Sequence, residues 1–341
     1  MRFAEIILEG QPTPFWTMLK QLGITEVVGV LPRRSADWRG VTTDHPWDYT
    51  PLALYKAMIE EEGLTLAAIE DNPPMDRLRY GMAGAEEELD QICAFVENLG
   101  RLGVPLWCYN WMASLGWMRT STRLRGRGNA IVSGYDHDLV KDAPPPALGR
   151  VGADTLWKTL EKFLHRVVPV AEKAGVTLAM HPDDPPGHSS IRGVARIMNN
   201  LGAFERLLEM VPSEANGITL CQGNFTLMTP DLPGVIRQLG ATGRVYFVHF
   251  RDVRGTVDKF VETFIDDGHT DMVACMRAYR DVGFDGIMRT DHTPTLCGDE
   301  PRYAGYSDLA RLHALGYLAG LRDAVLSEGV DHARAGLNES Y

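Results

Sequence analysis

The chain alternates between short apolar runs and helical stretches along nearly its whole length. Eight runs rich in Val, Ile, Leu and aromatic residues are typical of strands buried on both faces. A helical pattern follows each run, and several of these end at glycine, a common residue at the C-terminal end of a helix. Eight such repeats in 341 residues predict a single-domain (β/α)8 TIM barrel. The runs are 3–8, 25–30, 64–69, 104–110, 176–181, 217–221, 244–249 and 286–291.

Two segments interrupt or extend this repeat. Residues 111–153 lie between the fourth run and its helix, and a connection of this length usually covers a binding site or reaches a partner. We therefore expect an inserted loop or arm over the barrel mouth, and a homo-oligomer of two or more subunits. The barrel is expected to span residues 1–328, with a frayed tail at 329–341. Residues 191–211 have the pattern of one long helix.

The charge and the cysteines limit the partners and the compartment. The formal net charge of −11 argues against a nucleic-acid partner, because phosphate binding needs a basic face. Five scattered cysteines without CxxC spacing indicate a reducing compartment. The N-terminal run is interrupted by Glu5 and Glu9, so it predicts neither a signal peptide nor a membrane span. We expect a soluble, cytoplasmic protein with no membrane partner.

Four residues of metal-ligand type each close one of the last four apolar runs. They are His181, Cys221, His249 and Asp291. Active sites of (β/α)8 barrels lie at the C-terminal ends of the strands, and neighbouring strands are about 4.8 Å apart. Two imidazoles, a thiolate and a carboxylate that meet there predict a mononuclear metal site. A doubly wound sheet is the alternative fold, but it rarely carries functional residues on four successive strands.

Longer segments resemble one known family, in the same order over most of the chain. These segments are similar to the signature motifs of the mannonate dehydratase family, which belongs to the xylose-isomerase-like TIM barrels. They are CYNWMASLGWMRT at 108–120, HPDDPP at 181–186, GITLCQGN at 217–224, VHFRDV at 248–253, DDGHTDM at 266–272 and RTDH at 289–292.

The resemblance implies both a cofactor and a reaction. It implies that the four strand-end residues bind one divalent ion, usually Mn²⁺ or Fe²⁺ in this family, while a thiolate ligand also suits Co²⁺ or Zn²⁺. The implied reaction is the dehydration of a sugar acid, D-mannonate, to 2-keto-3-deoxy-D-gluconate. The chain departs from the family pattern at Asp252, Thr290 and Thr293, which leaves the exact sugar acid open.

The resemblance also implies that His292 and Tyr306 form the acid–base pair, without deciding which one is the base. His292 directly follows the ligand Asp291, and Tyr306 lies a short loop further on. Arg119 and Arg251 are candidate clamps for the substrate carboxylate, because a guanidinium fork matches that anion. A structural ion pair is the alternative role for each arginine.

Asn110 closes the fourth run and is a candidate for binding a substrate hydroxyl. Two rival functions stay open: a lyase acting on another sugar acid or keto-sugar, and a sugar isomerase or epimerase on the same fold. Isomerase and epimerase sites typically use Glu, Asp and His, so the thiolate of Cys221 favours the dehydratase. The fold alone cannot decide between them.

Overall fold

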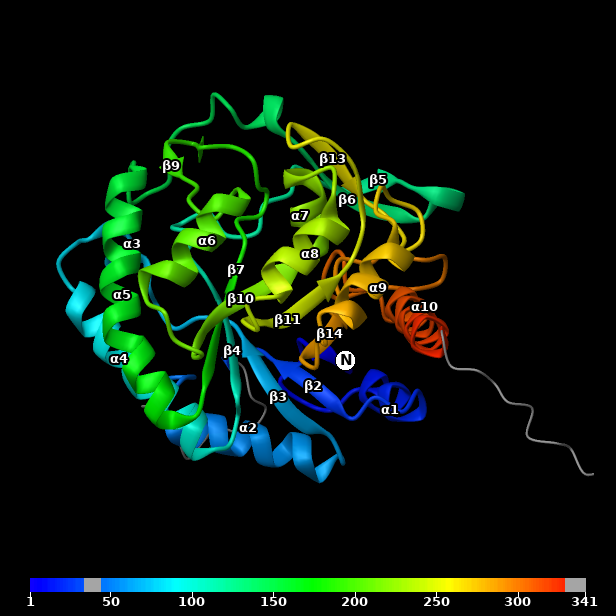
Figure 1. Cartoon of the computed structure of the whole chain (residues 1–341), viewed down its shortest axis with the longest axis horizontal. Helices are drawn as coiled ribbons and strands as arrows, with labels where there is room; N and C mark the ends of the chain where they lie inside the picture. The colour runs from blue at the N-terminus through cyan, green and yellow to red at the C-terminus, as the bar shows by residue number, and fades with distance from the viewer. Residues whose placement is uncertain (34–43, 329–341) are drawn as a thin grey trace, which may run out of the picture.

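The computed structural model describes residues 1–33 and 44–328, and it contains a closed barrel of eight parallel strands (Figure 1). The order around the barrel is β1-β14-β11-β10-β7-β4-β3-β2. Each barrel strand coincides with one of the eight apolar runs to within about two residues, so the predicted (β/α)8 fold is confirmed. The tail predicted at 329–341 lies outside the described residues. The barrel strands are β1 (Arg2–Ile7), β2 (Glu26–Gly29), β3 (Thr65–Glu70), β4 (Leu106–Asn110), β7 (Thr177–His181), β10 (Asn216–Cys221), β11 (Val245–Phe250) and β14 (Ile287–Thr290).

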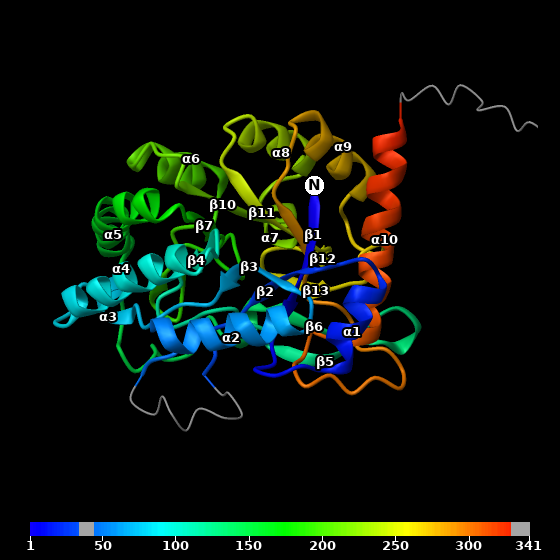
Figure 2. The same ribbon diagram turned by 90° about the horizontal axis from the view of Figure 1, so that it is seen from below.

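Helices surround the barrel, and their positions are clear from two directions (Figures 1 and 2). In the described chain, a helix of at least eight residues follows every barrel strand. Two shorter helices, α3 (Asp76–Tyr80) and α7 (Gln222–Met228), come directly after β3 and β10. The longer helices are α1 (Pro14–Gln21), α2 (Tyr49–Glu61), α4 (Ala85–Arg101), α5 (Ala153–Ala174), α6 (Leu201–Met210), α8 (Leu232–Gly240), α9 (Met272–Asp281) and α10 (Asp308–Ser327).

The helix predicted over residues 191–211 is wrong in its first half. A short hairpin of β8 (Ser190–Ile191) and β9 (Val194–Ala195) takes its place. Arg192 and Gly193 turn the hairpin with φ of 52° and 77°, a left-handed conformation that no α-helix contains. Helix α6 begins only after Asn200, whose side chain accepts a hydrogen bond from the Ala203 amide at 3.1 Å.

Helix α5 illustrates how the sequence produces the outer layer. Its buried side chains include Leu156, Leu160, Phe163 and Val167, spaced by three or four residues, so they form one apolar face against the barrel. The helix ends at Gly175, which has φ of 67° and therefore adopts the left-handed conformation that favours glycine.

The strands separate two apolar cores. The larger core lies between the sheet and the helices. A smaller core contains Ala68, Ala179 and Phe247, and the alternation of side chains along a strand places these residues inside the barrel. The residue two positions further along each of these strands faces the same way. By this rule the side chains of Glu70, His181 and His249 also face the inside of the barrel, next to the inner core at the C-terminal mouth.

The insertion at 111–153 contains regular structure in addition to loops. It includes β5 (Ser121–Arg125), β6 (Ile131–Asp136) and the short 3-10 helices η1 (Arg127–Asn129) and η2 (His137–Leu139). Strand β6 pairs antiparallel with β13, so the insertion joins a second excursion that leaves the barrel after β11 (Figure 1). The resulting sheet has the order β12-β13-β6-β5, with β12 (Val253–Gly255) and β13 (Lys259–Glu262).

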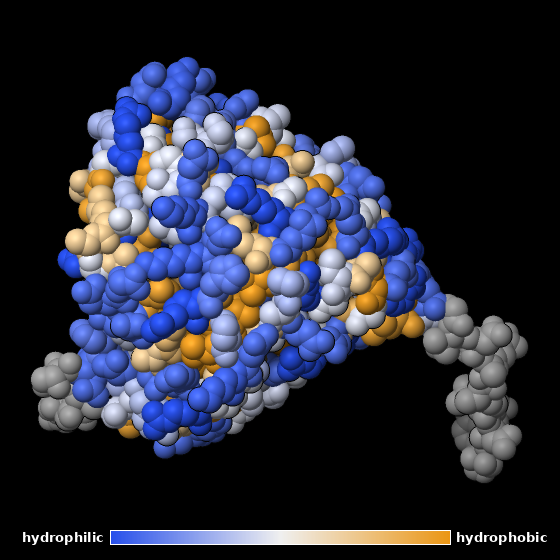
Figure 3. All heavy atoms as spheres, turned by 60° about the vertical axis from the view of Figure 1, so that its left-hand side comes forward, coloured by the Kyte–Doolittle hydropathy of each residue, from blue (hydrophilic) through white to orange (hydrophobic). Residues whose placement is uncertain are grey.

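Hydrophilic side chains cover most of the face drawn in Figure 3, with smaller apolar areas between them. Within residues 1–33 and 44–328, every helix is too short or too polar to cross a lipid bilayer.

Candidate metal centre and catalytic cavity

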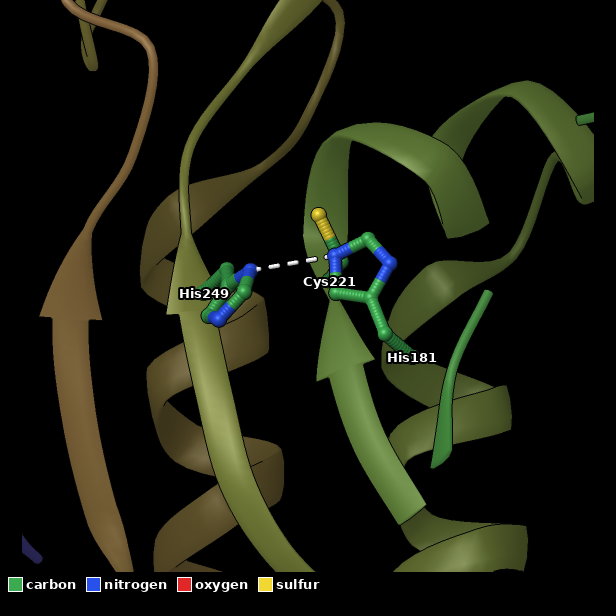
Figure 4. A group of neighbouring side chains, drawn as sticks. All are labelled: His181, Cys221 and His249. Carbon is green, nitrogen blue, oxygen red and sulfur yellow. Dashed lines mark hydrogen bonds between the residues drawn. The ribbon is translucent and has the colours of Figure 1, made fainter. Parts of the chain in front are cut away.

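Three adjacent strands bring His181, Cys221 and His249 together (Figure 4). Cys221 and His249 are direct partners in the register between β10 and β11, and His181 ends the neighbouring strand β7. Asp291 follows the last residue of β14, the strand that pairs with β11 on its other side. The four sequence-predicted ligands therefore lie at one arc of the barrel mouth.

The ligand atoms are close enough to share one ion. Those of His181, Cys221 and His249 all lie within 4.8 Å of one another. Asp291 is at the edge of this group, with Oδ2 at 3.9 Å from Cys221 Sγ and 3.8 Å from His249 Nδ1. His181 Nε2 and His249 Nδ1 are 3.2 Å apart. Two nitrogen ligands on one ion, each about 2.1 Å from it, are separated by about 3.0–3.4 Å at usual bond angles.

The surroundings of the two imidazoles indicate what belongs between them. His181 Nδ1 lies 2.7 Å from the Pro182 carbonyl, which only accepts, so Nδ1 carries the proton and Nε2 has a lone pair. His249 Nε2 lies 3.3 Å from a Glu70 carboxylate oxygen without the alignment of a hydrogen bond, and the negative charge there favours the tautomer with the proton on Nε2 and a lone pair on Nδ1. In this tautomer the two nitrogens that face each other, 3.2 Å apart, are both acceptors. A cation satisfies both, so these residues fit a bound metal ion.

The protonation tendencies of the ligands agree with this fit. Burial, and then the neighbouring His249, lowers the pKa of His181 to about 4, so the ring is neutral near pH 7. Burial raises the pKa of the Cys221 thiol, so a thiolate here needs a cation beside it. Burial also opposes ionisation of Asp291, but the nearby His292, Arg289 and Arg251 hold the pKa of Asp291 well below its usual range.

A cavity of about 260 Å³ opens beside these ligands. Two of the ligands, His181 and Asp291, line it, whereas Cys221 and His249 are fully buried behind its wall. The cavity also brings together three other residues singled out in the sequence, which are Asn110, His292 and Tyr306.

The two candidate acid–base residues have different hydrogen-bond partners. The Tyr306 hydroxyl donates to Asp291 Oδ1 at 3.1 Å. Burial, followed by the charge of Asp291, raises the pKa of Tyr306 well above its usual value, so the hydroxyl keeps its proton. His292 Nδ1 contacts an Arg251 N–H and also lies 3.3 Å from Glu262 Oε1, so its surroundings include both a donor and an acceptor. His292 Nε2 lies 3.5 Å from Asp291 Oδ1, so both candidates have a polar atom near the same carboxylate oxygen.

Trp117 forms part of the cavity wall next to His292. The centroids of the two rings are 4.8 Å apart, and the indole is 40% exposed. His292 has a φ of 43°, a left-handed backbone conformation that is uncommon for a residue with a side chain. The position of the imidazole is therefore set by the backbone after β14 and by the indole that covers it.

Arg119 and Arg251 are buried in ion pairs and do not line the cavity. Arg119 donates to both oxygens of Asp184 at 2.6 and 3.0 Å, and its Nε donates to Glu262 at 3.0 Å. Arg251 donates to the same two carboxylates at 3.1 and 3.2 Å. All four side chains are 1% exposed. These contacts match the ion-pair alternative, since a substrate carboxylate would have to displace a protein carboxylate to reach either guanidinium.

We expect Arg119→Met to lower the free energy of unfolding by about 3–5 kcal/mol, because it leaves Asp184 and Glu262 buried with less compensating charge. Urea unfolding of the metal-free protein measures this effect. Arg127→Met is the matched control, since Arg127 pairs with Asp266 in a partly exposed position. Its loss should cost no more than about 1 kcal/mol. Equal costs for the two variants would show that the buried ion pairs do not stabilise the fold.

Glu70 and Arg289 are among the charged residues of the cavity wall that the sequence did not single out. Glu70 ends β3 and Arg289 lies near the end of β14. Burial opposes ionisation of Glu70, but Arg289 and then His249 lower the pKa of its carboxyl group to about 2. A sequence signal was available for Glu70, because it directly follows the third apolar run, 64–69, near the expected C-terminal end of that strand.

A (β/α)8 barrel with a cluster of metal-ligand-type residues and a polar cavity at the C-terminal ends of its strands defines a class of barrel enzymes. Comparison with known families narrows that class. The model of the D-mannonate dehydratase (UxuA) family matches residues 16–151 and 146–331. The chain belongs to the D-mannonate dehydratase family.

Individual relatives agree with this membership. The mannonate dehydratase of Thermotoga neapolitana is 31% identical over 338 residues, covering 89% of this chain and 91% of its own. Mannonate dehydratase 2 of Halalkalibacterium halodurans is 31% identical and covers 82% of this chain and 88% of its own. The crystal structure of mannonate dehydratase from Streptococcus suis serotype 2 superposes with a TM-score of 0.86 at 26% identity, covering 96% of this chain and 95% of that one.

A structure of L-ribulose 3-epimerase is also similar, with a TM-score of 0.61 over 98% of this chain and 99% of that one. Its sequence identity of 15% supports a shared fold alone. The fold therefore includes epimerases, and the choice of reaction depends on the residues at the mouth of the barrel.

Proposed function

We propose that the protein is a metal-dependent hydro-lyase that converts D-mannonate to 2-keto-3-deoxy-D-gluconate and water. The observation that carries the proposal is the pair of facing imidazole nitrogens, 3.2 Å apart, beside a buried thiol and carboxylate in a chain of this family. Isomerase and epimerase sites on this fold typically use carboxylates and histidine, so Cys221 supports the dehydratase over that rival.

We propose that His181, Cys221, His249 and Asp291 hold one divalent ion. When bound, this ion supplies a Lewis acid that stabilises the negative charge formed when the C2 proton leaves a carbon next to a carboxylate. A hard, oxygen-rich substrate suits Mn²⁺ or Fe²⁺, while the thiolate ligand also suits Co²⁺ or Zn²⁺.

His292 and Tyr306 are proposed to move the two protons of the reaction. One residue accepts the C2 proton, and the other protonates the C3 hydroxyl as it leaves as water, so that the resulting enol becomes the keto product. Their shared contact with Asp291 Oδ1, at 3.5 and 3.1 Å, keeps both side chains at the same end of the cavity. The side chains of Trp117 and Met112 supply apolar parts of the cavity wall, with the Trp117 ring next to His292.

The far side of the cavity suits the hydroxyl-bearing tail of a sugar acid. Strands β3 and β4 lie beyond β7 in the barrel order, so the ends of these strands continue the mouth away from the proposed ligands. Asp71, Asn72 and Asn110 line this side and offer carboxylate and amide groups to hydroxyls. A linear aldonate therefore fits with its carboxylate near the ligands and its tail toward β3 and β4.

The test of this function is an assay of the metal-reconstituted protein on a panel of aldonates. Mn²⁺, Fe²⁺, Co²⁺ and Zn²⁺ are added in turn to stripped protein, and the 2-keto-3-deoxy product is measured. We expect the fastest turnover on D-mannonate, with no product in the stripped protein. Faster turnover of another aldonate would identify that compound as the substrate in place of D-mannonate. Epimerisation of a keto-sugar without any dehydration would favour the isomerases and epimerases.

We expect Asn110→Asp to raise KM for the aldonate by about 10-fold with little change in kcat, as loss of one hydrogen bond and a new negative charge both weaken ground-state binding. Asn110 Oδ1 accepts from Arg79 and from the Met112 amide, each at 3.1 Å. The aspartate variant can keep both contacts and loses only the amide donor. Steady-state kinetics of this variant beside Asn98→Ala, a substitution on α4 outside the cavity, checks the prediction. An unchanged KM would remove Asn110 from the substrate site.

We further propose that the protein works in the cytoplasm as a homo-oligomer. Four of the five cysteines are buried and free, which suits a reducing compartment. The insertion places β5 at the edge of its sheet, with most of its side chains exposed, and an exposed edge strand suits contact with another subunit. Analytical ultracentrifugation measures the oligomeric state, and a monomer at all concentrations would contradict this part of the proposal.

A further inference from the structure

Glu70 and Arg289 form a buried ion pair inside the barrel mouth. Arg289 Nε donates to Glu70 Oε2 at 2.8 Å, and Nη2 donates to Glu70 Oε1 at 2.7 Å. The arginine side chain is 1% exposed and that of the glutamate 18%. Two parallel bonds between planar groups fix the orientation of both side chains, which a single contact would not do.

Each member of the pair also reaches one of the proposed metal ligands. Glu70 Oε1 lies 3.3 Å from His249 Nε2. Arg289 Nη1 donates to Asp291 Oδ1 at 2.9 Å and to the Thr290 carbonyl at 2.6 Å. Strand register explains the geometry, since Arg289 is the direct partner of His249 between β14 and β11. One ion pair therefore touches ligands that come from two different strands.

We propose that Glu70 and Arg289 are positioning residues that set which atoms of His249 and Asp291 face the metal ion. The Glu70 carboxylate, 3.3 Å from His249 Nε2, favours the tautomer with the proton on that nitrogen, so that the lone pair of Nδ1 faces His181. Arg289 donates a hydrogen bond to Asp291 Oδ1. The other carboxylate oxygen, Oδ2, is therefore the one that faces His249 Nδ1, at 3.8 Å. This inference rests on the proposed metal centre and adds two residues that act through the ligands.

A change in charge alone is the competing explanation for any effect of these residues. Glu70→Gln removes one negative charge near a cation, and this weakens cation binding whatever the orientation of His249. The double variant Glu70→Gln/Arg289→Met removes one charge of each sign and leaves the net charge unchanged. If the pair acts by orientation, the double variant binds as poorly as either single variant. If it acts only by charge, the double variant recovers.

The experiment is a Co²⁺ titration of stripped full-length protein, followed by the thiolate-to-cobalt absorption and by equilibrium dialysis. Loss of a group that orients metal ligands typically weakens metal affinity by about 10–100-fold. We expect that loss, together with a changed Co²⁺ spectrum, in Glu70→Gln and in the double variant. The matched control is Glu88→Gln, which alters a buried glutamate that accepts from the Leu78 amide on the outer side of the barrel. It should keep the wild-type affinity and spectrum.

The outcomes separate the inference from the function on which it rests. Wild-type affinity and spectrum in Glu70→Gln, or recovery of affinity in the double variant, would overturn the positioning role while the metal centre stands. Failure of the wild-type protein itself to bind one Co²⁺ with a thiolate absorption would overturn the metal centre instead. Thermal unfolding of each stripped variant confirms that it is folded before titration. Glu70→Asp replaces any variant that is not folded. It should lose less affinity, because aspartate keeps the charge on a shorter side chain.

Discussion

Cys221→Ser is expected to abolish nearly all dehydratase activity and to weaken divalent-ion binding by at least about 100-fold. The thiolate is the ligand that brings a full negative charge close to both imidazoles, whereas a serine hydroxyl stays neutral near pH 7 and is a poor ligand for Fe²⁺ or Zn²⁺. The side chain is fully buried, so solvent cannot supply a replacement ligand without local rearrangement. Metal content after dialysis and product formation on D-mannonate are the two measurements.

Cys93→Ser is the matched control for this experiment. Cys93 is a buried thiol on α4, outside the cavity, and has no proposed ligand beside it. Its replacement should leave metal content and kcat unchanged. A Cys221→Ser protein that retains one tightly bound ion and normal turnover would remove the thiol from the proposed centre and reopen the comparison with isomerases.

The barrel could be predicted because its strands carry a strong local signal. A parallel strand covered on both faces is apolar throughout, and each such run in this chain is followed by a helix with its own periodicity. The hairpin at 190–195 lacked a comparable signal, since its residues also fit a helical pattern. The positive φ of Arg192 is a consequence of the tertiary context that the sequence does not display.

The sheet beside the barrel could not be predicted for a different reason. Strand β6 at 131–136 pairs with β13 at 259–262, more than 120 residues further along the chain. Neither strand is strongly apolar, and their pairing depends on where the barrel places the ends of β4 and β11. Local patterns therefore identified an insertion but not its partner.

The candidate metal ligands could be predicted because a single rule about strand ends selects them. Side chains at the C-terminal ends of parallel strands must meet at one mouth, and this rule selected His181, Cys221 and His249, whose ligand atoms the fold brings within 4.8 Å. The rule says nothing about which charges pair with which. The sequence left both a substrate clamp and a structural ion pair open for Arg119 and Arg251. The ion pairs depend on Asp184, in another barrel loop, and on Glu262, in the added sheet.

Tyr306→Phe and His292→Asn are each expected to lower kcat by about 10²–10⁴-fold while leaving the bound metal in place, which is the usual contribution of a general acid or base. Tyr306→Phe removes one oxygen from the cavity wall and keeps the ring. Asparagine tolerates the left-handed conformation of residue 292, where φ is 43°, so His292→Asn keeps the backbone. Single-turnover rates and metal content after dialysis measure the two effects. Near-normal turnover in both variants would show that the proton transfers use other groups.

Exchange of the C2 hydrogen with solvent assigns the two roles. In deuterated water, the variant that lacks the base should neither exchange C2–H nor form product, because the first proton transfer is blocked. The variant that lacks only the acid should still exchange, provided that the abstracted proton reaches solvent before it returns. The Tyr306 hydroxyl donates to Asp291 Oδ1 and therefore starts as a proton donor. A variant that exchanges without eliminating identifies the other residue as the base.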